Sequence, residues 1–280
     1  MRPVKHIVIF GILNTLASCL PEPLSVDGIP QLKPKIVVSS QVDDQTLLIL
    51  LTKSVGALEA NDNSNAEELL DLIAITDAVV TVSTSDFTET LTPLGNGLYV
   101  TVTIPLETDV EYFLEVVSES MGTVTASTYV KPRVSFDFLE ATIYYTGFDT
   151  LTEVSYGFND HPGKNFYMVN VQRLTNDFEP EDLLNPEIFT QLIDDKAFDG
   201  DTYFDRKRIF ANRDFVPGDT VGIFLSNISE EYYDFMQIRL DSRFSFAEFL
   251  GEPANYPSNI NGGLGFFNLY IPDVRILEIH

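Results

Sequence analysis

Short runs that alternate apolar or β-branched residues with polar ones follow one another along the chain from residue 36 onward. In the run 78–84, valines alternate with threonine and serine, and this period of two predicts a half-buried strand. Turn-forming residues separate the runs, as Gly95–Asn96–Gly97 does before the run 98–104. About seven short strands with frequent turns predict an immunoglobulin-like β-sandwich over residues 36–132.

A second β-rich domain is predicted over residues 133–280, so the fold class is mainly β. Two helical insertions are expected in this domain. Asn185–Pro186 is typical of an N-cap followed by proline at the first helical position, and Leu184, Ile188 and Leu192 then place an apolar stripe on one face. Ser229 is the expected N-cap of the second helix, because Glu230 and Glu231 would favour its dipole.

The first nineteen residues have a different pattern. Basic residues are followed by an apolar run over 7–16, which is shorter than the about 20 residues that span a bilayer. The small residues Ala17 and Ser18 come next. This layout predicts a signal peptide over residues 1–18. Leu16-Ala17-Ser18-Cys19 resembles the bacterial lipobox, which implies that Cys19 carries the N-terminal lipid. The alternative is an ordinary signal peptide with a chance cysteine.

Residues 19–35 contain four prolines and no periodicity, so they are expected to form a tether between the lipid anchor and the fold. Cys19 is the only cysteine, and an intrachain disulfide is therefore excluded. The formal net charge is −25, and it becomes −27 when Arg2 and Lys5 are lost with the signal peptide. A surface of this charge repels phosphate backbones, so nucleic acid is excluded as a partner.

Few residues in the chain are suited to catalysis. Outside the signal peptide, His161 and His280 are the only histidines, and no Gly-x-Ser-x-Gly motif accompanies them, so no catalytic residue and no zinc ligand is assigned. The absence of tryptophan argues against a glycosidase. The acidic stretch 59–71 is interpreted as a solvated insertion, with a calcium loop as the alternative. Carboxylates remain for a hydrolase or a calcium site: Asp194, Asp195, Asp199, Asp201 and Asp205.

The stretch Pro257–Phe267 resembles a segment near the end of a Bacteroidetes outer-membrane lipoprotein family, domain-of-unknown-function family 4249. The runs 34–38, 77–82 and 160–167 also resemble parts of that family, in the same order, as do 198–200 and 229–233. Ser39–Ser40 departs from its common Glu-Gly pair. The resemblance supplies no catalytic residues. It does mark a candidate contact loop: Asn259, Gly262, Gly263, Gly265, Phe266 and Phe267.

The resemblance implies an outer-membrane location and, by association, a TonB-dependent β-barrel as partner. Together with the lipobox, it predicts a lipid-anchored, non-enzymatic accessory or ligand-binding partner of such a receptor, with no cofactor and no resident metal. Two alternatives stay open, a structural or adhesive envelope protein and a carboxylate-based hydrolase.

Overall fold

The computed structural model describes residues 33–43, 45–54, 66–145, 147, 150–174, 188–209, 217–242 and 256–279. The chain divides into two units, Met1–Lys33 and Pro34–His280, and the description below concerns the second. Cys19, the predicted signal peptide and most of the predicted tether lie outside the described residues. Within the described part of the chain, no helix has the length and apolar character needed to cross a membrane.

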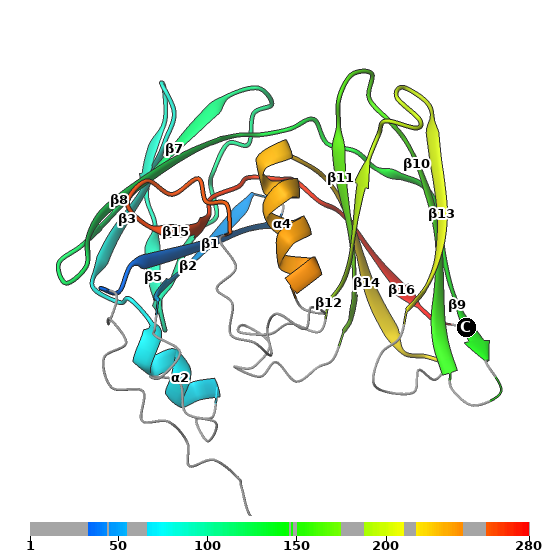
Figure 1. Ribbon diagram of the computed structural model, residues 1–280, viewed down its shortest axis with the longest axis horizontal. Coiled ribbons are helices and arrows are strands. Elements are labelled where there is room, and N and C mark those ends of the chain that lie inside the picture. Colours follow the sequence, from blue (N-terminus) through cyan, green and yellow to red (C-terminus); the bar gives the residue numbers. More distant parts are fainter. Residues whose placement is uncertain are drawn as a thin grey trace, which may run out of the picture. The chain divides into compact units, whose positions relative to one another are not determined.

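The first half of the unit is a sandwich of two sheets (Figure 1). A four-stranded sheet has the order β4 (Thr88–Thr90), β3 (Ala78–Ser83), β7 (Glu111–Ser118), β8 (Gly122–Tyr129). A five-stranded sheet has the order β15 (Leu264–Phe266), β1 (Ile36–Asp43), β2 (Thr46–Lys53), β6 (Leu98–Thr101), β5 (Thr92–Gly95). Inward residues of both sheets, such as Ile49 and Leu114, form one core.

The strand order of this sandwich is that of the immunoglobulin fold. With β1 to β8 taken as strands A, B, C, C′, D, E, F and G, the sheets read ABED and C′CFG. Tyr112 at the start of β7 also forms a tyrosine corner: its hydroxyl donates to the carbonyl of Pro105 and accepts the N–H of Glu107 at 3.0 Å. Buried Leu114 stands two residues later, where antibody domains have a cysteine. The predicted immunoglobulin-like sandwich is confirmed.

The second half of the unit repeats this arrangement. A three-stranded sheet has the order β13 (Thr202–Ile209), β10 (Thr150–Asn159), β9 (Phe136–Tyr145). A four-stranded sheet has the order β12 (Ile188–Asp194), β11 (Phe166–Arg173), β14 (Thr220–Ile228), β16 (Asp273–Glu278). In the same lettering these sheets are ABE and C′CFG, and their inward faces share a core that includes Tyr156, Tyr167 and Ile223.

The helix predicted from Asn185–Pro186 onward is wrong over its described part, because Ile188–Asp194 form strand β12, which is paired with β11. Residues 184–187 lie outside the described residues. Ile188 and Leu192 are four residues apart, a spacing that fits a helical stripe and also one face of a strand. Both faces of β12 carry apolar residues: Ile193 belongs to the sandwich core, whereas Leu192 packs against a cluster under helix α4. This burial on both sides produced the misleading pattern.

In the described part of the chain, two helices accompany the sheets. Helix α2 (Ala66–Ile73) lies in the stretch predicted as a solvated insertion, and Leu70 from it is buried. Residues 59–65 of that stretch lie outside the described residues. Helix α4 (Glu230–Ser242) begins as predicted, since Ser229 Oγ accepts the N–H of Tyr232 at 3.2 Å. It packs on the outer face of the β12–β11–β14–β16 sheet through Tyr232 and Met236.

The chain between α4 and β16 returns to the first sandwich. There β15 pairs in parallel with β1, with Gly265 opposite Val38, and Asn261 forms an isolated bridge with Thr125 of β8. Ser40 Oγ contacts the backbone of Asn268 twice, at 2.8 Å to its N–H and at 2.8 Å to its carbonyl. Residues from the range predicted for the second domain thus complete the edge of the first sandwich.

Candidate functional site

Three aspartates meet at one end of the second sandwich, and two of them, Asp195 and Asp199, were candidates from the sequence. One carboxylate oxygen from each of Asp160, Asp195 and Asp199 lies within 4.8 Å of the others. Asp160 follows β10, and the other two lie in the turn after β12. Asp160 was not predicted, because the two turns meet only through strand pairing: β10 pairs with β13, and β11 pairs with β12.

Hydrogen bonds within and between the two turns occupy these carboxylates. Asp160 accepts the N–H of Gly200 at 2.7 Å and the hydroxyl of Tyr167. Asp199 accepts the N–H of Gly163 at 2.8 Å, and Asp195 accepts the N–H of Asn165. Burial, and then the hydrogen bond to Asp160, raises the pKa of the Tyr167 hydroxyl above its usual range. A set of oxygen ligands of this kind suits calcium chemically. In the structure, these carboxylates accept hydrogen bonds that hold the two turns together.

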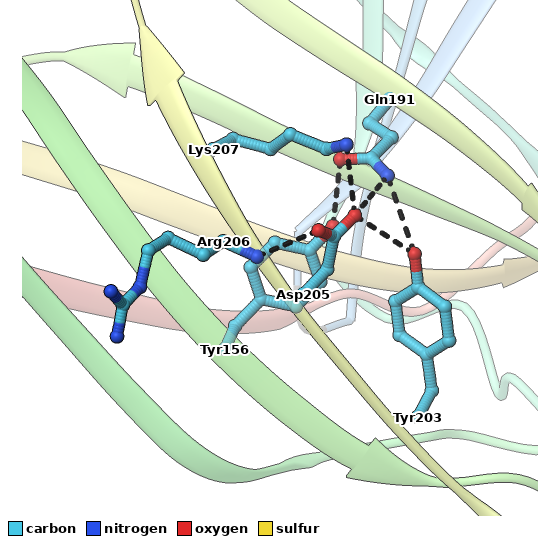
Figure 2. Close-up of polar contacts among 6 residues, drawn as sticks. All are labelled: Tyr156, Gln191, Tyr203, Asp205, Arg206 and Lys207. Atoms are coloured by element: carbon cyan, nitrogen blue, oxygen red, sulfur yellow. Dashed lines mark hydrogen bonds and ion pairs between the residues drawn. The ribbon is translucent and has the colours of Figure 1, made fainter.

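Asp205 lies apart from this cluster, in a polar network that joins the two sheets of the second sandwich (Figure 2). Gln191 on β12 accepts the hydroxyl of Tyr156 at 2.8 Å and donates its Nε2–H to Asp205 Oδ2 at 2.8 Å. Tyr203 also donates to this oxygen, at 2.9 Å, and Lys207 Nζ lies 3.0 Å from it. The network therefore connects strand β10 with the neighbouring edge strands β12 and β13.

Two opposing effects set the protonation of this network. Burial raises the pKa of Asp205, but hydrogen bonds from Gln191, Lys207, the N–H of Arg206 and Tyr203 outweigh it, so the pKa lies below its usual value. Burial, with the nearby Asp205 charge, raises the pKa of both Tyr156 and Tyr203. An ionised carboxylate held by neutral tyrosines and a lysine stabilises the fold and is poorly suited to exchange protons with a substrate.

The other residues weighed from the sequence occupy separate places. Asp194 pairs with Lys196 at 2.8 Å, and Asp201 lies exposed in the turn before β13. His161 Nε2 lies 3.1 Å from the carbonyl of Arg133. His280 lies outside the described residues. The structure thus separates the five candidate aspartates into several places instead of gathering them in one cleft.

The candidate contact loop is built into the first sandwich. The Asn259 side chain accepts the N–H of Phe267 at 2.9 Å and donates to the carbonyls of Phe267 and Ser127 at 2.7 and 3.2 Å. Phe266 and Phe267 are buried. Added Cβ atoms at Gly263 and Gly265 would lie 2.7 and 2.0 Å from the carbonyls of Ile36 and Val38, and Gly262 has a φ of +83°. These contacts give the loop a structural role, and its use as a contact surface stays a prediction.

Sequence reasoning did not single out the outer face of the β9–β10–β13 sheet. The rings of Phe138 and Phe204 lie over Gly157 with centroids 5.8 Å apart, and they remain 44% and 58% exposed. The Arg208 guanidinium stacks 3.6 Å from the ring centroid of Tyr144. We call the set formed by Phe138, Tyr144, Phe204, Arg206 and Arg208 the aromatic–arginine face. The alternation of Phe204, Arg206 and Arg208 was the available signal.

The strand orders and the tyrosine corner define the class of this protein as a tandem immunoglobulin-type β-sandwich. The chain belongs to the family described as "Domain of unknown function (DUF4249)", whose model matches residues 22–273. A comparison with curated proteins finds no match.

Two solved structures illustrate the similarity to known folds. One is described as "Cytokine receptor complex - Crystal form 1A", with 10% identity, coverage of 86% of this chain and 95% of that chain, and a TM-score of 0.25. The other is a segment of two fibronectin type-III domains from chicken tenascin, with 12% identity, coverage of 88% and 98%, and a TM-score of 0.23.

Proposed function

We propose that this protein is a non-enzymatic binding protein of the bacterial outer membrane, anchored by a lipid on Cys19, that docks on a TonB-dependent β-barrel receptor. The Leu16–Cys19 lipobox and the resemblance to Bacteroidetes outer-membrane lipoproteins support the anchor and the location. Several acyl chains on one cysteine hold a protein at a membrane, whereas one chain gives only marginal binding.

The aromatic–arginine face is the observation that carries the docking proposal. Exposed phenylalanine, tyrosine and arginine side chains are enriched in the energetically dominant parts of protein interfaces. Phe138 and Phe204 form a preassembled apolar contact, because Gly157 between them has no side chain to separate their rings. A protein surface with an apolar pocket rimmed by hydrogen-bond acceptors would fit this face.

The charges on this face also favour a protein partner. Arg206 and Arg208 both pair with Glu153, at 3.5 and 2.9 Å, and Arg206 Nε donates to Ser155 at 3.0 Å. Glu140 on β9 lies opposite Ser155 of β10. The charges of Arg206 and Arg208 are therefore balanced by those of Glu140 and Glu153, although the whole chain has a net charge of −25. Like-charge repulsion therefore opposes contact less here than elsewhere on so acidic a protein.

The alternative of a carboxylate hydrolase has less support. A glycoside hydrolase of the usual kind needs an acid and a second carboxylate facing one bond across a cleft. Here Asp160, Asp195 and Asp199 accept structural hydrogen bonds, and Asp205 is held by Lys207 and Tyr203. These engagements favour binding over catalysis.

Co-purification from native outer membranes in mild detergent, with mass spectrometry, tests the proposal. The wild type should carry lipid on Cys19 and elute with a stoichiometric TonB-dependent barrel. A Phe138→Ser, Phe204→Ser double variant should recover at most about a tenth as much barrel as the wild type, because losing the two anchors should raise the Kd at least about tenfold, or about 1.4 kcal/mol. Leu94→Ser, an exposed apolar residue on the first sandwich, is the matched control and should retain it.

Two results would contradict the proposal. A wild type that elutes alone would favour the structural or adhesive role. Equal barrel recovery with the double variant and with Leu94→Ser would show that the aromatic–arginine face is not the docking surface. Cys19→Ser in the background of the Phe138→Ser, Phe204→Ser double variant should release the protein from the membrane fraction, and retention there would overturn the lipid anchor.

A further inference from the structure

The outer face of β3, β7 and β8 on the first sandwich places one aromatic ring among polar side chains. The register aligns Ser83, Phe113 and Ser127 in one row across the three strands, and Thr81, Glu115 and Thr125 in the next. Asn261 extends the second row through its bridge to Thr125. A groove of about 420 Å³ lies here, lined by Ser83, Phe113, Glu115, Thr125, Ser127 and Asn261 together with the strand residues between them.

The polar groups of this groove are available to a ligand. Phe113 is 45% exposed, because it lies on the outward face of a strand whose alternate residues are buried. Among the described residues, no side-chain hydrogen bond or ion pair engages the Glu115 carboxylate, the Asn261 amide or the hydroxyls of Ser83, Thr125 and Ser127. This differs from the carboxylates of the second sandwich, whose hydrogen bonds are used within the fold.

A second ring lies beside the groove. Tyr129 is paired with Glu111 in the row after Phe113, so the two rings are diagonal neighbours on adjacent strands. Such positions are about 7–8 Å apart, within reach of aromatic side chains. Interaction with the neighbouring Glu111 raises the pKa of the Tyr129 hydroxyl. Phe113 and Tyr129 are therefore two exposed rings on adjacent strands, with the hydroxyl-bearing Ser127 between them in the register.

We infer that this groove binds a neutral carbohydrate chain, with one sugar ring stacked on Phe113. A sugar has an apolar C–H face that packs on an aromatic ring, and its rim of hydroxyls both donates and accepts hydrogen bonds. Serine and threonine hydroxyls and the Asn261 amide also do both, whereas the Glu115 carboxylate accepts from hydroxyls. The groove volume lies within the roughly 300–1,000 Å³ of small-molecule sites.

Charge and polarity argue against other ligand classes. Glu115 and the net charge of −25 repel an anionic ligand. A wholly apolar ligand would cover Glu115 and Asn261 without pairing them, which is costly. A cationic peptide would find a single carboxylate in the groove, surrounded by neutral hydroxyls. The groove lies on a different sandwich from the aromatic–arginine face. The inference rests on the proposed function only in one respect, which is that the bound sugar would be passed to the barrel.

The test uses the full-length, lipid-bearing protein in detergent and an array of neutral glycans, followed by calorimetric titration with the best neutral tetrasaccharide. The wild type should bind it saturably. Phe113→Ala should weaken binding at least about tenfold, and Glu115→Gln should weaken it by a smaller factor. Val102→Ala, an exposed residue of the same sandwich outside the groove, should bind as the wild type does.

The inference is overturned if no neutral glycan saturates the protein, if Phe113→Ala binds as tightly as Val102→Ala, or if a galacturonate oligomer or a basic peptide competes better than the neutral chain. Unfolding curves of the Phe113→Ala and Glu115→Gln variants should match the wild type, because both side chains are exposed. Co-purification of the barrel with Phe113→Ala separates the two proposals. A variant that no longer binds the sugar but still recovers the barrel tests the sugar site alone and leaves the docking proposal unaffected.

Discussion

The backbone of Gly265 passes so close to Val38 that a Cβ at residue 265 would lie 2.0 Å from the Val38 carbonyl oxygen. The two residues are opposite each other in the parallel pairing of β15 with β1, which attaches the segment after α4 to the first sandwich. Gly265 also has a φ of +88°, a region that other residues adopt only with strain. This contact makes the return of the chain dependent on glycine.

Gly265→Ala should therefore destabilise the fold strongly. We expect a loss of about 3 kcal/mol or more in the free energy of unfolding, because steric overlap adds to the roughly 1 kcal/mol cost of the left-handed backbone. Urea denaturation measures it. Gly122→Ala is the matched control, since Gly122 has the same φ of +88° but no atom within 4 Å of the place that an added Cβ would occupy. Equal losses for the two variants would refute the close approach.

The tyrosine corner gives a second prediction. Tyr112→Phe leaves the buried ring in place but removes the hydroxyl that the Pro105 carbonyl and the Glu107 N–H share. Leaving these backbone groups without their partner should cost about 1–3 kcal/mol of unfolding free energy. Tyr129→Phe removes an exposed hydroxyl from the same sheet and should cost well under about 1 kcal/mol. A negligible loss in Tyr112→Phe would show that the corner does not stabilise the sandwich.

Six strands of the first sandwich were predictable because each buries alternate residues: β1, β2, β3, β6, β7 and β8. In β7, Tyr112, Leu114 and Val116 point inward, whereas Phe113 and Glu115 point outward, and this alternation is visible in the sequence. Strand β12 was not predictable in this way, because the core covers one of its faces and the cluster under α4 covers the other. Its apolar pattern then matched a helix.

The sites depended on register and on long-range pairing, which local patterns do not contain. Asp160 and Asp199 are brought together when β10 pairs with β13 and β11 pairs with β12, so that the two turns meet. The alignment of Ser83, Phe113 and Ser127 likewise requires the register of three strands, although each residue is an outward position of its own strand. The glycines of the C-terminal loop predicted a turn that brings the backbone close to the core, but the sequence did not show that β1 is the strand they approach.

The aspartate cluster should contribute to stability without metal. Asp160→Ala removes the acceptor of the Gly200 N–H and of the Tyr167 hydroxyl, both at the junction of two turns, and should cost about 2–3 kcal/mol. Thermal unfolding with chelator and with millimolar calcium measures both this loss and any metal effect. We expect the wild-type midpoint to be the same in the two conditions. A rise with calcium that Asp199→Asn abolishes would instead identify a calcium site.

The Asp205 network predicts a pH dependence with a definite sign. The pKa of Asp205 is lower in the folded protein than the ordinary value of 3.8. Between these two pKa values the unfolded chain binds more protons, so the stabilisation from Asp205 is complete above the ordinary pKa and is lost as pH falls through the folded pKa. The Asp205→Asn variant has no carboxyl group at residue 205, so this contribution to its stability does not change with pH. It should be less stable than the wild type at pH 7, because it loses the ion pair with Lys207 and weakens the bonds from Gln191 and Tyr203.

Unfolding free energies of the wild type and Asp205→Asn, measured from pH 7 down to pH 3, test this prediction. The gap between the two should be constant above about pH 5 and should narrow below it, since only the wild type loses a carboxylate contribution. Asp201→Asn, in the exposed turn before β13, is the control, and its curve should stay close to that of the wild type throughout. A gap that stays constant to pH 3, or that widens, would show that the charge of Asp205 does not stabilise the link between β12 and β13.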